Sequence, residues 1–172
     1  SLHIDDSDSK EYLTKIINKM FILFSSICII IISVLPLVFD ILIKGEYAAS
    51  YNYMPILLIA SLFNVVVGLY SAIYVAKKET KQLAKSSVLV AIINIVVNIL
   101  LIKKIGLYAA AISTLIAYFV MMIIRYIDVK KYINIKLKFK NIIYVIIGIA
   151  MSLLSYYSSN LMVIVINFAL IM

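Results

Sequence analysis

Long apolar runs separated by short polar segments dominate the chain. They cover about residues 20–39, 54–76, 84–102, 107–124, 142–157 and 161–172. An α-helix rises about 1.5 Å per residue, so about 20 apolar residues cross the hydrocarbon layer of a membrane. The first five runs predict membrane-spanning helices, and the sixth, too short to cross, is interpreted as a truncated span. Residues 1–19 are polar and mixed in charge, and we expect a cytoplasmic segment that leads into the first helix.

The composition agrees with this pattern and excludes several classes of protein. Hydrophobic residues make up 65% of the chain and charged residues 14%, whereas about a quarter of a soluble domain is charged. A soluble chain of 172 residues cannot hide this much apolar surface. The sequence therefore predicts an all-α integral membrane protein, a bundle of about six transmembrane helices over residues 20–172.

Catalytic and metal-binding residue types are scarce. The chain has one cysteine, Cys28, inside an apolar run, and one histidine, His3, outside all of them. Neither a disulfide nor a metal site of Cys and His can be built from these residues, and no set of acid, base and nucleophile lies within the spans. We expect no enzyme activity, no metal and no cofactor.

Positive charge alternates between the two sides of the predicted bundle. The first polar segment holds three Lys, the loop after the second span holds four, and the segment after the fourth span holds six Lys or Arg. The opposite side holds only Lys44, Lys103 and Lys104. The positive-inside rule places the richer side, and with it the N-terminal segment, in the cytoplasm. This topology explains the net charge of +8 better than nucleic-acid binding does, so we expect no nucleic-acid partner.

Small residues recur at helical spacing in three spans. Helix backbones approach closely in lipid where such residues line up. We interpret these stripes as packing faces, with a binding role as the alternative. The packing residues are Ala60, Gly68 and Ala72 in the second span, Ala91 in the third, and Gly106, Ala110 and Thr114 at the fourth.

Three asparagines, Asn64, Asn94 and Asn98, lie on the same small-residue faces. An unpaired amide in an apolar interior costs about 1–3 kcal/mol, so each needs a partner. Two interpretations stay open: hydrogen bonds that join helices, or the lining of a polar cavity.

Other polar side chains lie near the span ends. Tyr70 and Tyr74 are candidates for contact with a sugar in a cavity, although an aromatic belt at the membrane interface is the simpler interpretation. Arg125 is a candidate contact for a lipid phosphate. Its simpler interpretation, which we favour, is a positive anchor at the cytoplasmic boundary.

Four segments resemble a known family when taken together. They are residues 44–48 (KGEYA), 77–81 (KKETK), 91–102 (AIINIVVNILLI) and 106–114 (GLYAAAIST). Their order and spacing resemble the C-terminal half of Wzx-type polysaccharide and O-antigen flippases, within the multidrug/oligosaccharidyl-lipid/polysaccharide exporter superfamily. The chain departs from that pattern at Lys103, where Pro is usual, and at Ala109, where Gly is usual.

The resemblance implies a C-terminal half of a transporter with twelve to fourteen helices in the bacterial cytoplasmic membrane. Such a protein flips undecaprenyl-diphosphate-linked oligosaccharide across the membrane by alternating access. The implied partners are the lipid-linked oligosaccharide, membrane lipids, the N-terminal half of the same transporter and the polysaccharide polymerase machinery. Two alternatives remain: a drug or metabolite exporter of the same superfamily, and a non-transporting membrane scaffold subunit.

Overall fold

The computed structural model describes residues 7–42, 45–133 and 137–158, which form helices joined by short connections. No strand occurs in these ranges. The sixth apolar run, residues 161–172, lies outside them. In chain order the elements are α1 (Ser7–Leu42), the 3₁₀ helix η1 (Gly45–Asn52), α2 (Met54–Ala76), α3 (Thr80–Ile105), α4 (Tyr108–Val129) and α5 (Phe139–Ser158).

Five of these helices, α1 to α5, are long and apolar enough to cross a membrane. This confirms an all-helical structure over the described part of the chain, and the five long apolar helices indicate a multi-pass membrane protein. The helices extend beyond the apolar runs that predicted them: α3 begins at Thr80 rather than near residue 84, and α5 begins at Phe139. The reason is that Lys, Gln and Ser continue a helix readily, so backbone hydrogen bonding does not stop where hydropathy falls.

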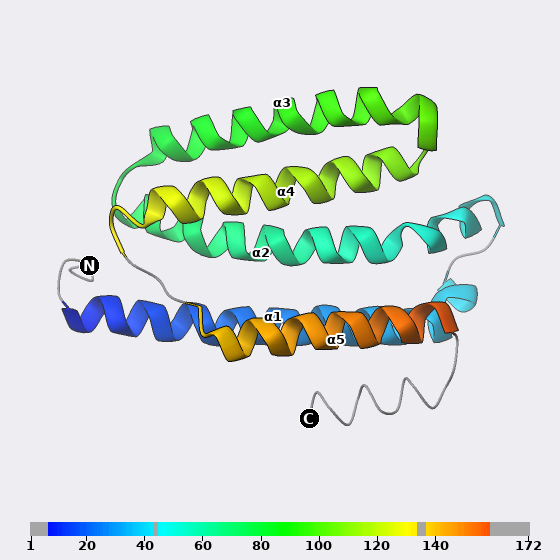
Figure 1. The fold of residues 1–172 in the computed structure, drawn as a ribbon, viewed down its shortest axis with the longest axis horizontal. Coiled ribbons are helices and arrows are strands. Elements are labelled where there is room, and N and C mark those ends of the chain that lie inside the picture. The colour runs from blue at the N-terminus through cyan, green and yellow to red at the C-terminus, as the bar shows by residue number, and fades with distance from the viewer. Residues whose placement is uncertain (1–6, 43–44, 134–136, 159–172) are drawn as a thin grey trace.

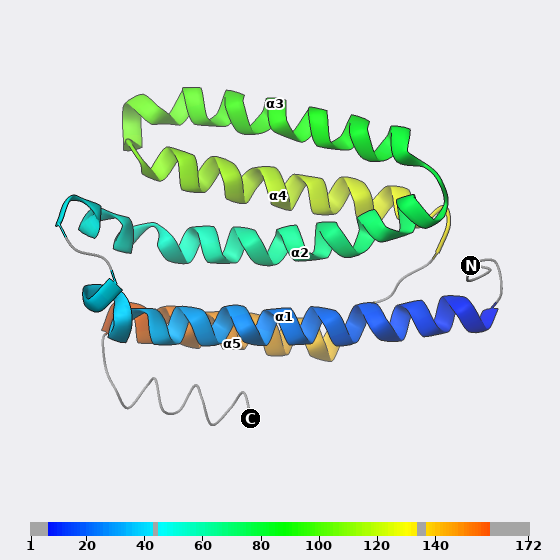
Figure 2. The same ribbon diagram turned by 180° about the vertical axis from the view of Figure 1, so that it is seen from behind.

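The five long helices lie side by side, and consecutive ones run in opposite directions (Figure 1). Helix α4 packs between α2 and α3, while α1 packs on α5 and also touches α2. The view from behind shows the same two groups, α2 with α3 and α4, and α1 with α5 (Figure 2). The α2–α3 and α3–α4 connections are short, and they leave these successive helices no room to point the same way.

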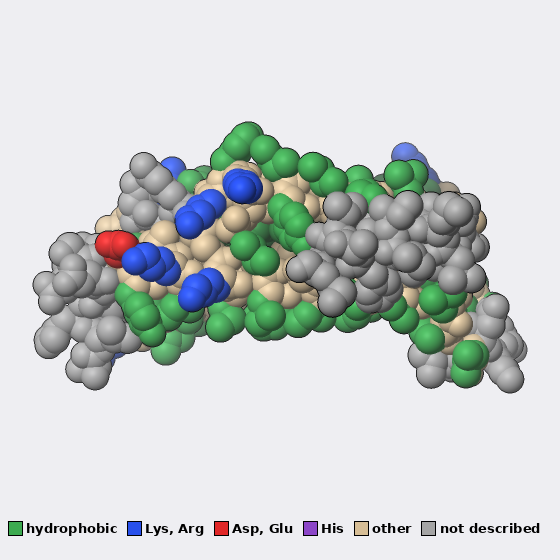
Figure 3. Space-filling model, turned by 90° about the horizontal axis from the view of Figure 1, so that it is seen from below, with side chains coloured by type: hydrophobic (Ala, Val, Ile, Leu, Met, Phe, Trp, Pro, Cys, Tyr) green, Lys and Arg blue, Asp and Glu red, His purple; other side chains and the backbone are tan. Residues whose placement is uncertain are grey.

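Basic residues gather at one end of the molecule. The N-terminal end of α1, the α2–α3 connection and the start of α5 lie toward the same side in Figure 1, and the α3–α4 turn lies at the other end. Most of the Lys and Arg side chains visible from below lie toward that first end (Figure 3). The fold therefore brings together the charged segments that the alternating pattern assigns to one side of the membrane.

The interior is built from two apolar clusters. The larger one joins α1, α2 and the C-terminal end of α4, with Val145 of α5 at its edge, and the smaller one joins α2, α3 and α4. Helix α4 reaches both because most of its buried positions recur every four residues, which keeps them on one face. These positions are Ala109, Ser113, Ala117, Met121, Arg125 and Val129, and Ala111 beside them is also buried.

Helices α1 and α5 pack closely at Gly148 of α5. A Cβ at this position would lie 2.5 Å from Cδ1 of Ile29 on α1, so a larger residue would push the end of that buried side chain aside. Buried serines line the same two helices, and Ser25 and Ser33 donate to backbone carbonyls one turn earlier. Their hydroxyls are thus satisfied within α1, and small size is what they contribute to packing.

A stacked pair of tyrosines, Tyr51 and Tyr156, lies at the end opposite the basic one, and we call it the aromatic clasp. Tyr51 of η1 stacks on Tyr156 of α5 with ring centroids 4.4 Å apart. Each hydroxyl donates to the other residue's backbone carbonyl, at 2.9 Å from Tyr51 and 2.6 Å from Tyr156. The clasp joins the connection before α2 to the end of α5, so η1 is held although its own helix is short.

Candidate functional site

Arg125 lies one turn before the end of α4, on its buried face, and its side chain is only 4% exposed. A buried guanidinium loses its hydration, which several hydrogen bonds must replace. The surroundings of Arg125 therefore identify the candidate site.

Two neighbouring helices supply those hydrogen bonds. From α3, the Ser86 hydroxyl oxygen accepts from Nε of Arg125 at 3.3 Å, and the Ser87 hydroxyl oxygen accepts from Nη2 at 2.9 Å. From α2, the Val67 carbonyl accepts from Nη1 at 3.3 Å, and the Ser71 hydroxyl accepts from the same nitrogen. One side chain of α4 thus joins the ends of all three helices.

The serine hydroxyls are oriented by their own helices. Ser71 donates its hydroxyl hydrogen to the Val67 carbonyl at 2.6 Å, and Ser86 and Ser87 donate theirs to the Leu83 carbonyl at 2.9 Å. Because each hydrogen is bound to a carbonyl, each oxygen turns lone pairs toward the guanidinium. Neutral dipoles, rather than a carboxylate among the described residues, surround this cation.

A second contact lies one turn further along α4. The Tyr74 hydroxyl of α2, whose side chain is fully buried, donates to Oδ2 of Asp128 at 2.8 Å. Lys131 pairs with the other oxygen of Asp128, and this hydrogen bond raises the pKa of Lys131. Asp128 is therefore held by Tyr74 and Lys131, and it does not neutralise Arg125.

A cleft of about 390 Å³ opens beside this network. Tyr74, Lys85, Ser86 and Asp128 are among the residues that line it. Ser86 borders the cleft and also binds Arg125, so the cleft reaches the edge of the buried cation.

The structure brings some of the predicted site residues together. Arg125 and Tyr74 belong to the network just described. Tyr70 is also buried, but it lines a different cavity of about 380 Å³ together with Met122 and Tyr126. The lipid-phosphate role of Arg125 stays a prediction.

The three asparagines lie elsewhere. Asn64 is exposed on α2, and Asn94 and Asn98 are half-buried on α3. Oδ1 of Asn98 is shielded and has no hydrogen-bond partner among the described residues. Neither the cleft beside Arg125 nor the cavity at Tyr70 is lined by these residues. Their role in a cavity or in helix association stays a prediction.

The predicted packing residues are mostly on open faces. Ala60 is buried and Thr114 is half-buried; the exposed ones are Gly68, Ala72, Ala91, Gly106 and Ala110. On α4 the buried line through Ala109 and Ser113 runs one position away from the predicted one. Gly106 instead ends α3 with φ +57° and ψ −135°, a backbone conformation that favours glycine.

The residues that sequence reasoning missed are Ser71, Ser86, Ser87 and Asp128. The serines lie 38 to 54 positions from Arg125 in the chain. The only local signals were the adjacent serines at the basic end of α3 and an acid three positions after the arginine.

Comparison of the chain with protein-family models, with curated proteins and with solved structures finds no match. Any function assigned to the chain therefore has to come from its sequence pattern and its geometry.

Proposed function

We propose that this chain is the C-terminal helical bundle of a transporter that flips lipid-linked oligosaccharide across the bacterial cytoplasmic membrane. The observation that carries the proposal is the series of four segments that resembles Wzx-type flippases in order and spacing. The last three lie on or beside consecutive membrane helices: residues 77–81 at the α2–α3 connection, 91–102 within α3 and 106–114 at the start of α4.

The exposed surface of α3 supports a bundle that belongs to a larger assembly or faces lipid. Only 6% of the most apolar 18-residue stretch of α3 is buried, and large apolar side chains such as Ile92, Ile95 and Ile99 are exposed. The half-buried amides of Asn94 and Asn98 lie on the same helix. In the proposed transporter this helix meets lipid on one side and the N-terminal half of the protein on the other.

The position of the acidic residues favours the flippase over the drug exporter. Within the described helices, Glu11 and Asp128 lie near the ends of the candidate spans rather than mid-membrane. Exporters of the superfamily more often use a carboxylate in the middle of the membrane. The basic end of the molecule suits an anionic, diphosphate-linked substrate instead.

The test is deletion of the gene that encodes this chain. Lipid-linked repeat units should accumulate in the inner leaflet, surface polysaccharide should fall, and the intact gene should restore both. Normal surface polysaccharide in the deletion strain would refute the proposal. Drug sensitivity with an intact surface glycan would favour the exporter, and loss of a copurifying complex without a transport defect would favour the scaffold.

A further inference from the structure

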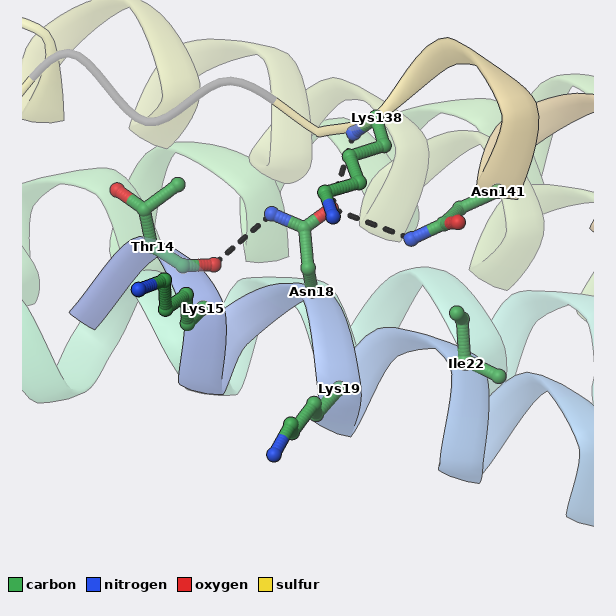
Figure 4. A pocket seen from close by; sticks show the side chains of 7 residues that line it. All are labelled: Thr14, Lys15, Asn18, Lys19, Ile22, Lys138 and Asn141. Carbon is green, nitrogen blue, oxygen red and sulfur yellow. Dashed lines mark hydrogen bonds between the residues drawn. The ribbon is translucent and has the colours of Figure 1, made fainter. Parts of the chain in front are cut away.

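A separate polar pocket lies between α1 and the first turn of α5, at the basic end (Figure 4). It has a volume of about 220 Å³ and is formed by Thr14, Lys15, Asn18, Lys19, Ile22, Lys138 and Asn141. At about 30 Å³ per water, this volume is large enough for a hydrated phosphate group.

Asn18 fixes the shape of this pocket. Its side chain is 6% exposed, and its Oδ1 accepts from the Lys138 backbone N–H at 2.9 Å and from Nδ2 of Asn141 at 3.3 Å. Its Nδ2 donates to the Thr14 carbonyl at 2.8 Å. Figure 4 shows these bonds reaching from α1 to the start of α5. The two walls are therefore held together before any ligand arrives.

The pocket carries excess positive charge. Three lysines, Lys15, Lys19 and Lys138, contribute to its lining, and none of the seven lining residues is acidic. Glu11 pairs with Lys15 at 2.8 Å, but both side chains are about two-thirds exposed, at 69% and 66%, so solvent weakens this pair. The first turn of α5 borders the pocket, and a helix N-terminus adds partial positive charge.

The pocket also lies at the right depth for a lipid headgroup. Ile22 belongs to its lining, and the apolar part of α1 continues from there to Phe39, whereas Lys15 and Lys19 lie toward the polar end. The boundary between charged and apolar side chains marks the headgroup region of a membrane. Basic pockets between helices at this level suit phosphate groups.

We propose that this pocket binds a phosphate group, supplied by the headgroup of an anionic phospholipid in the leaflet at the basic end. Lys15, Lys19 and Lys138 attract the phosphate, and the second N–H of the Asn141 amide donates to it. This site is distinct from the Arg125 network, which lies between α2, α3 and α4. The proposal requires only that the chain spans a membrane, and it holds whether or not the protein transports oligosaccharide.

The test measures lipid binding to the purified full-length protein in micelles by native mass spectrometry. Phosphatidylglycerol should bind more tightly than phosphatidylcholine. The triple substitution Lys15→Gln, Lys19→Gln and Lys138→Gln should weaken phosphatidylglycerol binding at least about tenfold, because the pocket loses the three positive charges that attract the phosphate. The matched control replaces Lys78, Lys81 and Lys130, at the same end but outside the pocket, and should change binding less than about twofold.

A second variant keeps every charge. Asn141→Ala should weaken binding about fivefold, the equivalent of about one hydrogen bond. Circular dichroism would check that both variants keep their helix content. Equal loss in the pocket variant and in its control, or no loss in either, would overturn the proposal.

Inorganic phosphate distinguishes the two sources of the anion. Excess inorganic phosphate should leave phosphatidylglycerol bound, because the acyl chains hold the lipid at the membrane level. If inorganic phosphate protects the pocket lysines from chemical modification while phosphatidylglycerol does not, the lipid assignment is wrong and the pocket binds a free anion.

Discussion

At the scale of single residues, Arg125 shows how a cation is kept inside a helix bundle without a carboxylate among the described residues. Three hydroxyls and one carbonyl accept its hydrogen bonds. Each hydroxyl can do so because its hydrogen is given to a carbonyl of its own helix. Hydrogen bonds to charged groups contribute about 1.5–3 kcal/mol, about twice a neutral one. We therefore expect these serines to contribute more to the free energy of unfolding than their small side chains suggest.

A double-mutant cycle tests this dependence. Ser71→Ala should lower the free energy of unfolding by about 1–3 kcal/mol, because part of a buried charge loses its acceptor. In an Arg125→Met background the same change should cost about 1 kcal/mol less, since no charge remains to be solvated. Arg125→Met alone should be nearly neutral, as apolar replacement of buried ions often is. Reversible unfolding of the full-length protein in mixed micelles measures all three.

The control for this cycle is Thr114→Ala. The Thr114 hydroxyl donates to the Ala110 carbonyl at 2.8 Å within α4 and is not among the partners of Arg125. It should show no coupling to Arg125→Met. Equal costs of Ser71→Ala in both backgrounds would mean that the serine serves packing alone.

The contact between Tyr74 and Asp128 supports a second prediction at this scale. Tyr74→Phe keeps the buried ring and removes only the hydroxyl that donates to Asp128. We expect a loss of about 1–2 kcal/mol in the free energy of unfolding, because the bond involves a partly shielded carboxylate. Tyr70→Phe is the matched control, since Tyr70 is equally buried but its hydroxyl makes no hydrogen bond with the described residues. Similar losses in the free energy of unfolding for both substitutions would show that the hydrogen bond to Asp128 does not contribute to stability.

At the scale of the helices, the small residues on one helix do not by themselves decide where two helices approach closely. Both helices of a pair decide it. The spacing of small residues predicted contacts through Gly68 and Ala110, and both are exposed. The tight approach occurs instead at Gly148, opposite Ile29. A single helix shows which residues are small, but the rotation of its neighbour decides which of them are covered. Lipid or further helices can cover the open faces.

Two glycine substitutions distinguish a covered helix face from an open one. Gly148→Val should destabilise the α1–α5 pair by about 1–3 kcal/mol, because the new side chain overlaps Ile29 in a packed interface. Gly68→Val should be neutral or slightly stabilising, since a Cβ there meets nothing within 4 Å and glycine is a poor helix former. Thermal unfolding of the full-length protein measures both. A large loss for Gly68→Val would reveal a helix that packs on this face from outside the described residues.

At the scale of the whole molecule, charge and hydropathy agree with the arrangement of the helices. Alternating helices carry the connections to opposite ends, so basic segments far apart in the chain meet at one end. The Arg125 network and the polar pocket between α1 and α5 both lie at this end. An excess of Lys and Arg on one side is the main determinant of orientation in a membrane.

Cysteine accessibility tests this orientation. In a background with Cys28→Ala, Lys81→Cys lies in the first turn of α3 and Lys104→Cys in its last turn. A membrane-impermeant maleimide applied to intact cells should label position 104, and position 81 only after permeabilisation. Labelling of both positions from the same side would contradict a membrane-spanning α3, and labelling of only position 81 in intact cells would reverse the proposed orientation.

The sequence by itself determined the number and type of the described long helices and the end at which their charges gather. These properties depend on local runs of residues: a hydrophobic stretch of sufficient length must be helical in lipid, because no water satisfies its backbone groups. The same local logic placed Arg125 near a span end, and it marked Tyr74 as a candidate.

Only the tertiary structure decided what those residues contact. The serines around Arg125 come from two other helices. The pocket between α1 and α5 exists because Asn18 of α1 accepts from the Lys138 backbone N–H, just before α5 and 120 positions away in the chain. Hydropathy does not specify the rotation of one helix against another, which depends on side-chain shapes and hydrogen bonds summed over the whole interface. That rotation buried Arg125, exposed Gly68 and brought Gly148 against Ile29.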